Sequence, residues 1–227
     1  MDRTESGNGF WNRLSESDRL LLSAAGRVTR YRPGAVVCTE GEPATHVLVL
    51  MSGWVKVTTV SRDGRELILA LRGHGDIIGE LGEVSGYRTA TVQAIDEVRS
   101  LLIPNERFSV FLEARPDAGR AFRQVMTQRW GEANSTLLSR FTTTGAQRLA
   151  GLLLDLAARH GIPSPGQVDI EMPLSQEELA SFVGASRSTL TRAYDSWRHR
   201  GFIRTSYRHI AITDVDGLRK VARRGKE

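Results

Sequence analysis

The hydrophobic pattern of the chain changes its period near Pro116, and this change restricts the fold more than any other feature. Before it, nine glycines divide residues 31–104 into short β-rich runs, which is typical of a sandwich or barrel of short strands. After it, apolar residues recur at steps of three and four, as they do along one side of a helix. The 227 residues therefore predict an α+β protein in which a β part precedes a helical part.

The β part is expected to begin with a helix and to continue with at least five strands. Ser15 can cap a helix within residues 12–26, because an apolar run follows it. The SRDG sequence at 61–64 predicts a hairpin turn. The expected strands are 46–51, 54–60, 66–71, 88–94 and 98–104. We assign residues 1–115 to this β-roll domain.

A long helix with a narrow apolar stripe is expected over residues 116–142. The stripe could pack against the β domain of its own chain or pair with the same helix of a second subunit. Its length and narrowness favour pairing in a homodimer. The predicted interface residues are Phe122, Met126, Trp130, Ala133, Leu137 and Phe141. The TTTG sequence at 142–145 ends the stripe, and a new amphipathic helix over 146–161 begins the last domain, 146–227.

The net charge of +5 is concentrated in one segment of this last domain. Between Ser186 and Ile210 there are six arginines and a single acid, Asp195, so the rest of the chain is neutral overall. Arginines interspersed with the aromatic residues Tyr194, Trp197 and Phe202 are typical of a surface that binds a polyanion, although a solvated basic face has the same composition.

A helix-turn-helix motif overlaps the basic segment. Ser175 and Glu178 form a capping box before a helix that extends to about Phe182, and the VGAS sequence at 183–186 supplies a turn. A second helix should extend from Ser186 to about Arg200, with two strands of a wing in 202–213.

The second helix of the motif has two different faces. Leu190, Tyr194 and Trp197 share one face and are expected to be buried. The opposite face, near the amino-terminal end, is the end that such motifs insert into the major groove. The predicted DNA-contacting residues are Ser186, Arg187, Ser188, Thr191 and Arg192, together with Arg208 of the wing.

The composition disfavours several other classes of protein. Cys38 is the only cysteine, which excludes an internal disulfide and a cysteine-ligated iron–sulfur cluster. The five histidines are too scattered to predict a metal site, and no set of catalytic residues can be assembled, so an enzyme is not expected. No run of about 18 apolar residues exists and the start lacks a signal-peptide core, so a cytoplasmic protein without a membrane segment is expected.

With a β-roll, a long helix and a winged helix in this order, the chain resembles the CRP/FNR family of bacterial transcription regulators. The resemblance extends from about residue 12 to 222. Its motifs are GEPATHVLVLMSGWVKV (41–57), GDIIGELG (75–82), RTATV (88–92) and LSQEELASFVGASRSTLTR (174–192). It implies a jelly-roll-like effector domain, a homodimer joined by the long helix, and a winged helix that binds a palindromic operator in double-stranded DNA. An activator of this kind would also contact RNA polymerase.

One alternative is a cyclic-nucleotide-binding regulatory protein that acts on a protein partner. Such a protein would share residues 31–104 but has no use for the winged helix.

The resemblance also implies that Arg187 and Arg192 contact DNA. Ser188 stands where catabolite-type members have glutamate, so we expect an operator that differs at the corresponding base pair.

The resemblance further implies a cyclic-nucleotide site in the β domain, with cyclic AMP or cyclic GMP as the ligand. Family members hold the ribose with a Gly-Glu-Leu segment, the cyclic phosphate with an Arg-Thr or Arg-Ser pair, and the base with residues of the long helix. The corresponding residues here are Gly79, Glu80, Leu81, Arg88, Thr89 and Asn134.

Three departures from the family pattern affect this site. The interval from Gly79 to Arg88 is nine residues, which is one or two fewer than in nucleotide-binding members. Glu83 adds a carboxylate near the expected phosphate, which it would repel. Ala133 lacks the hydroxyl that cyclic-AMP binders offer to the adenine. Three outcomes therefore stand: the motifs serve only the turns of the roll, a nucleotide binds weakly or with altered selectivity, or the effector is unrelated.

Overall fold

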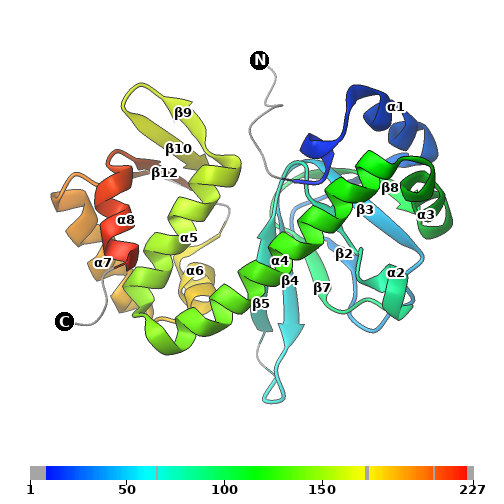
Figure 1. Cartoon of the computed structure of the whole chain (residues 1–227). Helices are drawn as coiled ribbons and strands as arrows, with labels where there is room; N and C mark the ends of the chain where they lie inside the picture. Colours follow the sequence, from blue (N-terminus) through cyan, green and yellow to red (C-terminus); the bar gives the residue numbers. More distant parts are fainter. Residues whose placement is uncertain (1–8, 65, 172–173, 207, 224–227) are drawn as a thin grey trace. The chain divides into compact units, whose positions relative to one another are not determined.

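The computed structural model describes residues 9–64, 66–171, 174–206 and 208–223, without the side chains of Glu83 and Val84. The chain divides into two compact units, Met1–Arg129 and Trp130–Glu227 (Figure 1). The division falls inside the long helix, whereas the sequence suggested a boundary at the TTTG segment. The reason is that the first half of the helix packs on the β domain.

The first unit is built on two four-stranded antiparallel sheets, with strand orders β1-β8-β3-β6 and β2-β7-β4-β5. The strands are β1 (Arg27–Tyr31), β2 (Val36–Cys38), β3 (His46–Ser52), β4 (Val55–Val60), β5 (Glu66–Arg72), β6 (Ile77–Ile78), β7 (Thr91–Ala94) and β8 (Val98–Pro104). The sheets are open, so the fold is a β-roll rather than a closed barrel.

The predicted hairpin and four of the five predicted strands are confirmed. β4 and β5 pair in antiparallel register, and Gly64 has the positive φ of 78° that their turn requires. The expected strand over 88–94 was too long, because it begins only at Thr91 and Arg88 lies in the segment before it with its side chain buried.

Two hydrophobic cores lie on opposite sides of the β1-β8-β3-β6 sheet. Between the two sheets, Cys38, Leu48 and Val92 belong to one cluster. On the other side, helices α1 (Glu16–Ala25), α3 (Asn105–Ala114) and the start of α4 (Pro116–Thr142) cover the sheet (Figure 1). The Ser15 side chain accepts a hydrogen bond from the backbone N–H of Asp18, as the predicted helix cap requires.

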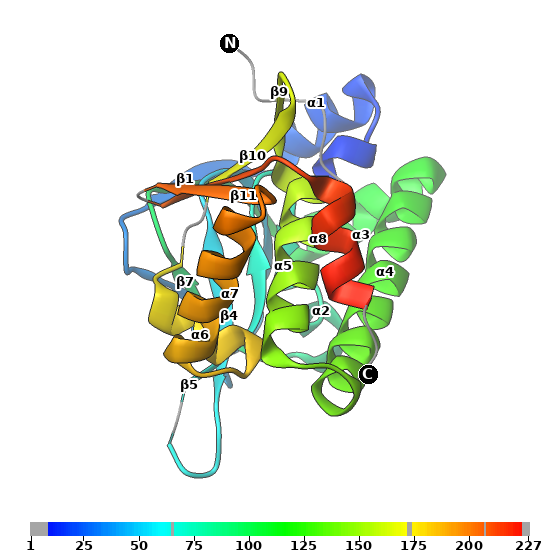
Figure 2. The same ribbon diagram turned by 90° about the vertical axis from the view of Figure 1, so that its left-hand side faces the viewer.

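In its described residues, the second unit contains the end of α4, four further helices and one antiparallel sheet of order β11-β12-β10-β9 (Figure 2). The helices are α5 (Gly145–His160), α6 (Gln176–Val183), α7 (Arg187–His199) and α8 (Val215–Arg223). The strands are β9 (Ile162–Ser164), β10 (Gln167–Glu171), β11 (Ile203–Ser206) and β12 (His209–Ile212). The predicted helix-turn-helix and wing are therefore present, and β9, β10 and α8 are additions that the sequence did not predict.

Candidate DNA-binding surface and effector site

The second helix of the motif, α7, begins at a capped end. The Ser186 hydroxyl accepts a hydrogen bond of 3.2 Å from the backbone N–H of Thr189. Leu190, Tyr194 and Trp197 are 0%, 6% and 3% exposed, so the face predicted to be buried is confirmed. This packing fixes which side of α7 faces solvent.

The solvent-facing side of α7 contains all of the residues predicted to contact DNA. Ser186, Arg187, Ser188, Thr191 and Arg192 are exposed, as is Arg208 in the turn of the wing. Arg187 pairs with Glu177 at 3.3 Å, but their side chains are 67% and 79% exposed, so this ion pair is weak and easily exchanged. The surface therefore offers several solvent-exposed donors beside the amino-terminal end of a helix.

The aromatic residues of the basic segment belong to the core of the motif, as predicted for Tyr194 and Trp197 from their spacing on the helix. Tyr194, Trp197 and Phe202 are buried, because they belong to the core face of the motif. Tyr194 and Trp197 pack edge to face, and the guanidinium of Arg200 lies 4.3 Å from the centre of the Phe202 ring. They stabilise the motif and are not part of its exposed basic surface.

Arg88 is the most unusual residue of the first unit. It is 4% exposed, and its Nη1 donates a long hydrogen bond of 3.5 Å to the carbonyl oxygen of Gly79. Its Nη2 is buried with no hydrogen-bond partner within the described part of the chain. A buried guanidinium that is only partly satisfied is costly and matches a site for an anion.

Gly79 allows Arg88 to occupy this position. Its φ of +83° favours glycine, and a Cβ atom at this position would overlap Nη1 of Arg88. The charge of Arg88 also affects its neighbours. Burial lowers the pKa of His46 and Arg88 lowers it further, whereas burial raises the pKa of Cys38 and Arg88 opposes that rise.

Glu80 is held by Arg129, a residue that the sequence did not single out. Nη1 of Arg129 donates to Glu80, and Nη2 donates to the carbonyl oxygen of Ile77 at 2.8 Å and lies 3.4 Å from Asp76. The side chains of Glu80, Asp76 and Arg129 are 9%, 10% and 14% exposed. Arg129 follows Val125 by four residues on the buried side of α4, and this spacing predicts the side of the helix on which it lies but not its partners.

The other predicted effector residues differ from Arg88 in their exposure. Leu81 and Thr89 are exposed. Asn134 is exposed and belongs to the second unit. The side chain of Glu83 lies outside the described residues.

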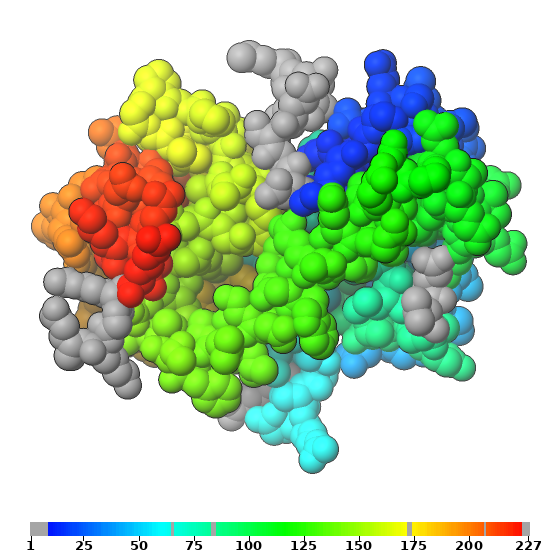
Figure 3. Space-filling model, viewed as in Figure 1, coloured from blue at the N-terminus to red at the C-terminus, as the bar shows by residue number. Residues whose placement is uncertain are grey.

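The stripe of α4 divides into two parts. Phe122 packs edge to face against Phe10 and Phe108, and Met126 packs against the same core, as expected if the stripe covers its own β domain. Ala133 is exposed, as are Trp130, Leu137 and Phe141 at 71%, 57% and 82%. Leu138, which was not predicted, is 63% exposed. In the space-filling view α4 faces the viewer (Figure 3, green).

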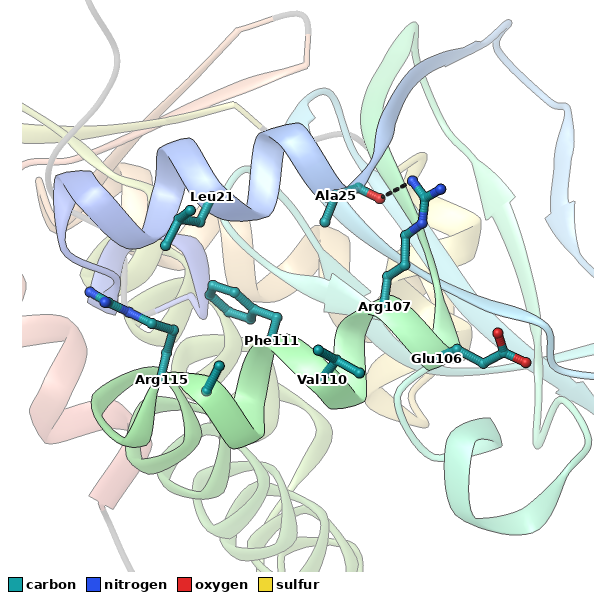
Figure 4. Close-up of a pocket in the computed structure, with 8 residues that line it drawn as sticks. Leu21, Ala25, Glu106, Arg107, Val110, Phe111 and Arg115 are labelled. Carbon is teal, nitrogen blue, oxygen red and sulfur yellow. Dashed lines mark hydrogen bonds between the residues drawn. The ribbon is translucent and has the colours of Figure 1, made fainter.

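A separate hollow of about 490 Å³ lies between α1 and α3 (Figure 4). Its lining is mostly apolar and contains none of the predicted effector residues. Arg107 donates to the carbonyl oxygen of Ala25 and Arg115 pairs with Asp18, so neither of its arginines converges on the hollow as an unpaired donor.

Metal and membrane sites were also considered in the described ranges. Within them, no group of three or more His, Cys, Asp or Glu side chains is placed to hold a metal ion. None of the helices described has an apolar stretch long enough to span a bilayer.

Two family models match the chain. Residues 28–115 match the model of the cyclic nucleotide-binding domain, and residues 147–221 match the Crp-like helix-turn-helix domain. An effector domain followed by a DNA-binding helix-turn-helix defines this protein as a transcription regulator.

The relatives identify the family. A CRP-like cAMP-activated global transcriptional regulator of Mycobacterium tuberculosis is 31% identical over 224 residues, which cover 98% of this chain and 100% of the relative. A global nitrogen regulator of Synechococcus elongatus is 26% identical over 82% of this chain and 85% of its own length. The chain therefore belongs to the CRP/FNR family.

A solved structure shows the same fold. FixK2 from Bradyrhizobium japonicum superposes with a TM-score of 0.77 at 21% identity, over 88% of this chain and 99% of that chain. The predicted fold of effector domain, long helix and winged helix is thus confirmed.

Proposed function

We propose that this protein acts as a homodimer that binds a palindromic DNA operator and that a cyclic nucleotide in the first unit controls this binding. The observation that carries the DNA-binding part is the exposed amino-terminal end of α7, where Arg187, Ser188, Thr191 and Arg192 share one solvent-facing side. An arginine fork can bind both major-groove acceptors of a guanine, and hydroxyl groups can bond base edges or phosphates.

In this proposal the residues of the motif have distinct roles. Arg187 and Arg192 contact bases, and Ser186 and Thr191 bond the backbone or base edges near the helix end. Arg208 has a φ of 52° in the turn of the wing, which presents its exposed side chain to a phosphate. Ser188 is a weaker acceptor than a carboxylate, so the preferred base pair at its position should differ from the catabolite-type operator.

The dimer contact is supported by the second half of α4. Trp130, Leu137, Leu138 and Phe141 are each more than half exposed, and large apolar side chains grouped on a helix are typical of a helix-helix interface. Met126 and Phe122 are engaged in the core of the first unit, so they contribute to the dimer at most through their partly exposed surfaces.

The effector part rests on Arg88. The unsatisfied Nη2 of this buried guanidinium, which the missing side chain of Gly79 accommodates, fits an anionic group such as a cyclic phosphate. The relative from Mycobacterium tuberculosis is described as cAMP-activated, which makes cyclic AMP the first ligand to test. Thr89 would add a hydroxyl beside the phosphate, and Glu80 would face the ribose while Arg129 holds it in place. Asn134 would reach the base from the long helix, where Ala133 offers no hydroxyl.

DNA binding can be tested with an operator obtained by selection from a random pool. Wild-type affinity in a gel shift should fall steeply as salt is raised, because phosphate contacts release counterions. Arg192→Ala should weaken specific binding by about tenfold or more. Arg219→Ala is the matched control, since Arg219 is an exposed arginine of α8 that pairs with Asp216 outside the motif. A flat salt dependence in the wild type would count against the proposal, and so would equal effects of the two substitutions.

The effector can be tested by calorimetric titration with cyclic AMP and cyclic GMP. We expect micromolar binding that Arg88→Ala abolishes and Arg107→Ala retains, because Arg107 bonds the carbonyl oxygen of Ala25 instead. No heat of binding with the wild-type protein would restrict the proposal to DNA binding alone. For the dimer, Phe141→Glu should produce monomers on sedimentation, and an unchanged dimer would place the interface elsewhere.

A further inference from the structure

Arg148, in the first turn of α5, joins two parts of the second unit that are distant in sequence. Its Nε donates to the carbonyl oxygen of Val183 at 2.6 Å, and its Nη2 donates to that of Gly184 at 2.9 Å. Its Nη1 donates to Thr143 at 2.5 Å and more weakly to Ser139 at 3.4 Å. One guanidinium therefore binds four carbonyl oxygens, two at the end of α4 and two at the end of α6.

These carbonyl groups lie in the last turn of each helix or at the residue after it, and that of Ser139 also accepts from the backbone N–H of Thr143. The last carbonyls of a helix have no partner within it, and they form the negative end of its dipole. A guanidinium has five donors in a fixed plane, so it can cap two helix ends at once. Burial lowers the pKa of Arg148 and Arg140 lowers it further. The hydrogen bonds to four carbonyl oxygens favour the charged guanidinium at this position.

A second contact joins the same two segments. Gly145, the first residue of α5, packs so closely on the turn between α6 and α7 that a Cβ atom there would lie 2.5 Å from Cβ of Ala185. The same atom would lie 3.6 Å from Cγ2 of Thr189, which is in the first turn of α7. The segment after α4 therefore touches the start of α7 directly.

We infer that Arg148 is a positioning residue for DNA binding, which fixes the turn before α7 to the carboxyl end of α4. This inference rests on the proposed role of α7 in contacting the operator. Ser186, the cap of α7, lies two residues after Gly184, so α7 must follow the end of α4 as long as Arg148 holds both. In a dimer joined through α4, the spacing between the two copies of α7 would then be set by the long helices, as recognition of two half-sites requires.

The test compares specific with non-specific DNA binding in the full-length protein. Arg148→Met should lower affinity for the selected operator by about tenfold to a hundredfold, which corresponds to misplacing one base contact in each half-site. Affinity for unrelated DNA should be unchanged, because it depends on charge near phosphates and Arg148 does not belong to the exposed basic surface. A merely structural defect would lower both affinities together.

Arg159→Met is the matched control. Arg159 is also in α5 and its side chain is 14% exposed, but its ion pairs are with Glu132 of α4 and with Asp155 of α5 itself. This variant should retain the ratio of specific to non-specific affinity. If Arg148→Met retains that ratio as well, the inference is wrong. If the wild type itself shows no preference for any operator, the proposed function fails first.

Two further variants keep the test decisive if Arg148→Met does not fold. Arg148→Lys retains the charge, but a single ammonium group cannot reach four carbonyls, so specific binding should fall without loss of non-specific binding. Gly145→Ala leaves Arg148 intact, but its added Cβ collides with Ala185 and so separates the start of α5 from the turn before α7. A normal affinity ratio in both of these folded variants would overturn the inference.

Discussion

Replacement of Arg129 by methionine should destabilise the first unit strongly, because it removes the cation that binds the buried carboxylate of Glu80 and also pairs with Asp76. Glu80 and Asp76 are 9% and 10% exposed at their side chains, and both face the guanidinium of Arg129. Arg120 provides a control on the same helix, since it pairs with Asp117 while their side chains are 68% and 78% exposed.

The two pairs should differ several-fold in their contribution to stability. Removal of one partner from a buried ion pair costs about 3–5 kcal/mol, whereas an exposed pair contributes about 0.2–1 kcal/mol. With a urea m-value of about 2 kcal/mol/M, a loss of about 4 kcal/mol lowers the unfolding midpoint by about 2 M. Arg120→Met should lower it by less than about 0.5 M.

The single cysteine makes this measurement specific to the first unit. Cys38 is 7% exposed in the core between the two sheets, so a thiol reagent labels it only after that core opens. Tryptophan fluorescence would mix the signals of both units, because Trp11 and Trp54 lie in the first and Trp130 and Trp197 in the second.

Glu80→Gln separates charge from packing in this experiment. Added to Arg129→Met, it should recover part of the lost stability because it removes one uncompensated carboxylate. Equal midpoints for Arg129→Met and Arg120→Met would refute the argument that Glu80 and Arg129 form a buried pair. So would a double variant that is less stable than Arg129→Met alone.

Three further predictions concern single residues. The pKa of Asp18 is lowered chiefly by the hydrogen bond from Ser15 and then by Arg115, against the effect of burial, so its carboxylate stabilises the fold above the ordinary pKa of 3.8. The stability difference between wild type and Asp18→Asn should be full at neutral pH and should shrink as pH falls through the lowered pKa; a constant difference in acid unfolding curves would contradict this. Burial raises the pKa of Tyr194 to about 12, and its hydroxyl has no hydrogen-bond partner in the described ranges. Tyr194→Phe should therefore leave the free energy of unfolding unchanged or raise it by up to about 1 kcal/mol. A clear loss of stability in thermal unfolding would reveal a partner for the hydroxyl. Gly79→Ala should abolish nucleotide binding in a calorimetric titration, because the added Cβ displaces Arg88. Gly86→Ala should retain nucleotide binding, because Gly86 also has a positive φ, of 78°, but open space around it. Equal loss of binding in the two variants would show that backbone strain alone is responsible.

The elements that sequence predicted best are those whose ends are set by local chemistry. α6 begins at the capping box of Ser175 and Glu178 and ends at Gly184, which adopts a φ of 60°. By contrast, β1 pairs with β8, so that Val28 lies opposite Leu101, about seventy residues further along the chain. β6 has only two residues, which pair with β3. Their existence depends on distant partners, which a local pattern does not contain.

The site was predictable in its chemistry but not in its connections. The motif alone gave Gly79 and Arg88, and the structure brings them together. Arg129 could not be assigned in the same way, because the periodicity of α4 shows which residues share a side but not what that side meets. Phe122 and Met126 meet the β domain, whereas Trp130 and Phe141, further along the same helix, face solvent.

The division of α4 between Arg129 and Trp130 also sets a rule for exchanging sensor halves between regulators of this family. A transplanted sensor that ended at Pro116 would lose Phe122, which completes an aromatic cluster with Phe10 and Phe108, and would depend on a foreign helix for the cation that holds Glu80. A joint placed after Arg129 keeps those contacts in one piece of inherited sequence. Hybrid biosensors, and natural recombinants as well, should tolerate a crossover there better than at the helix start.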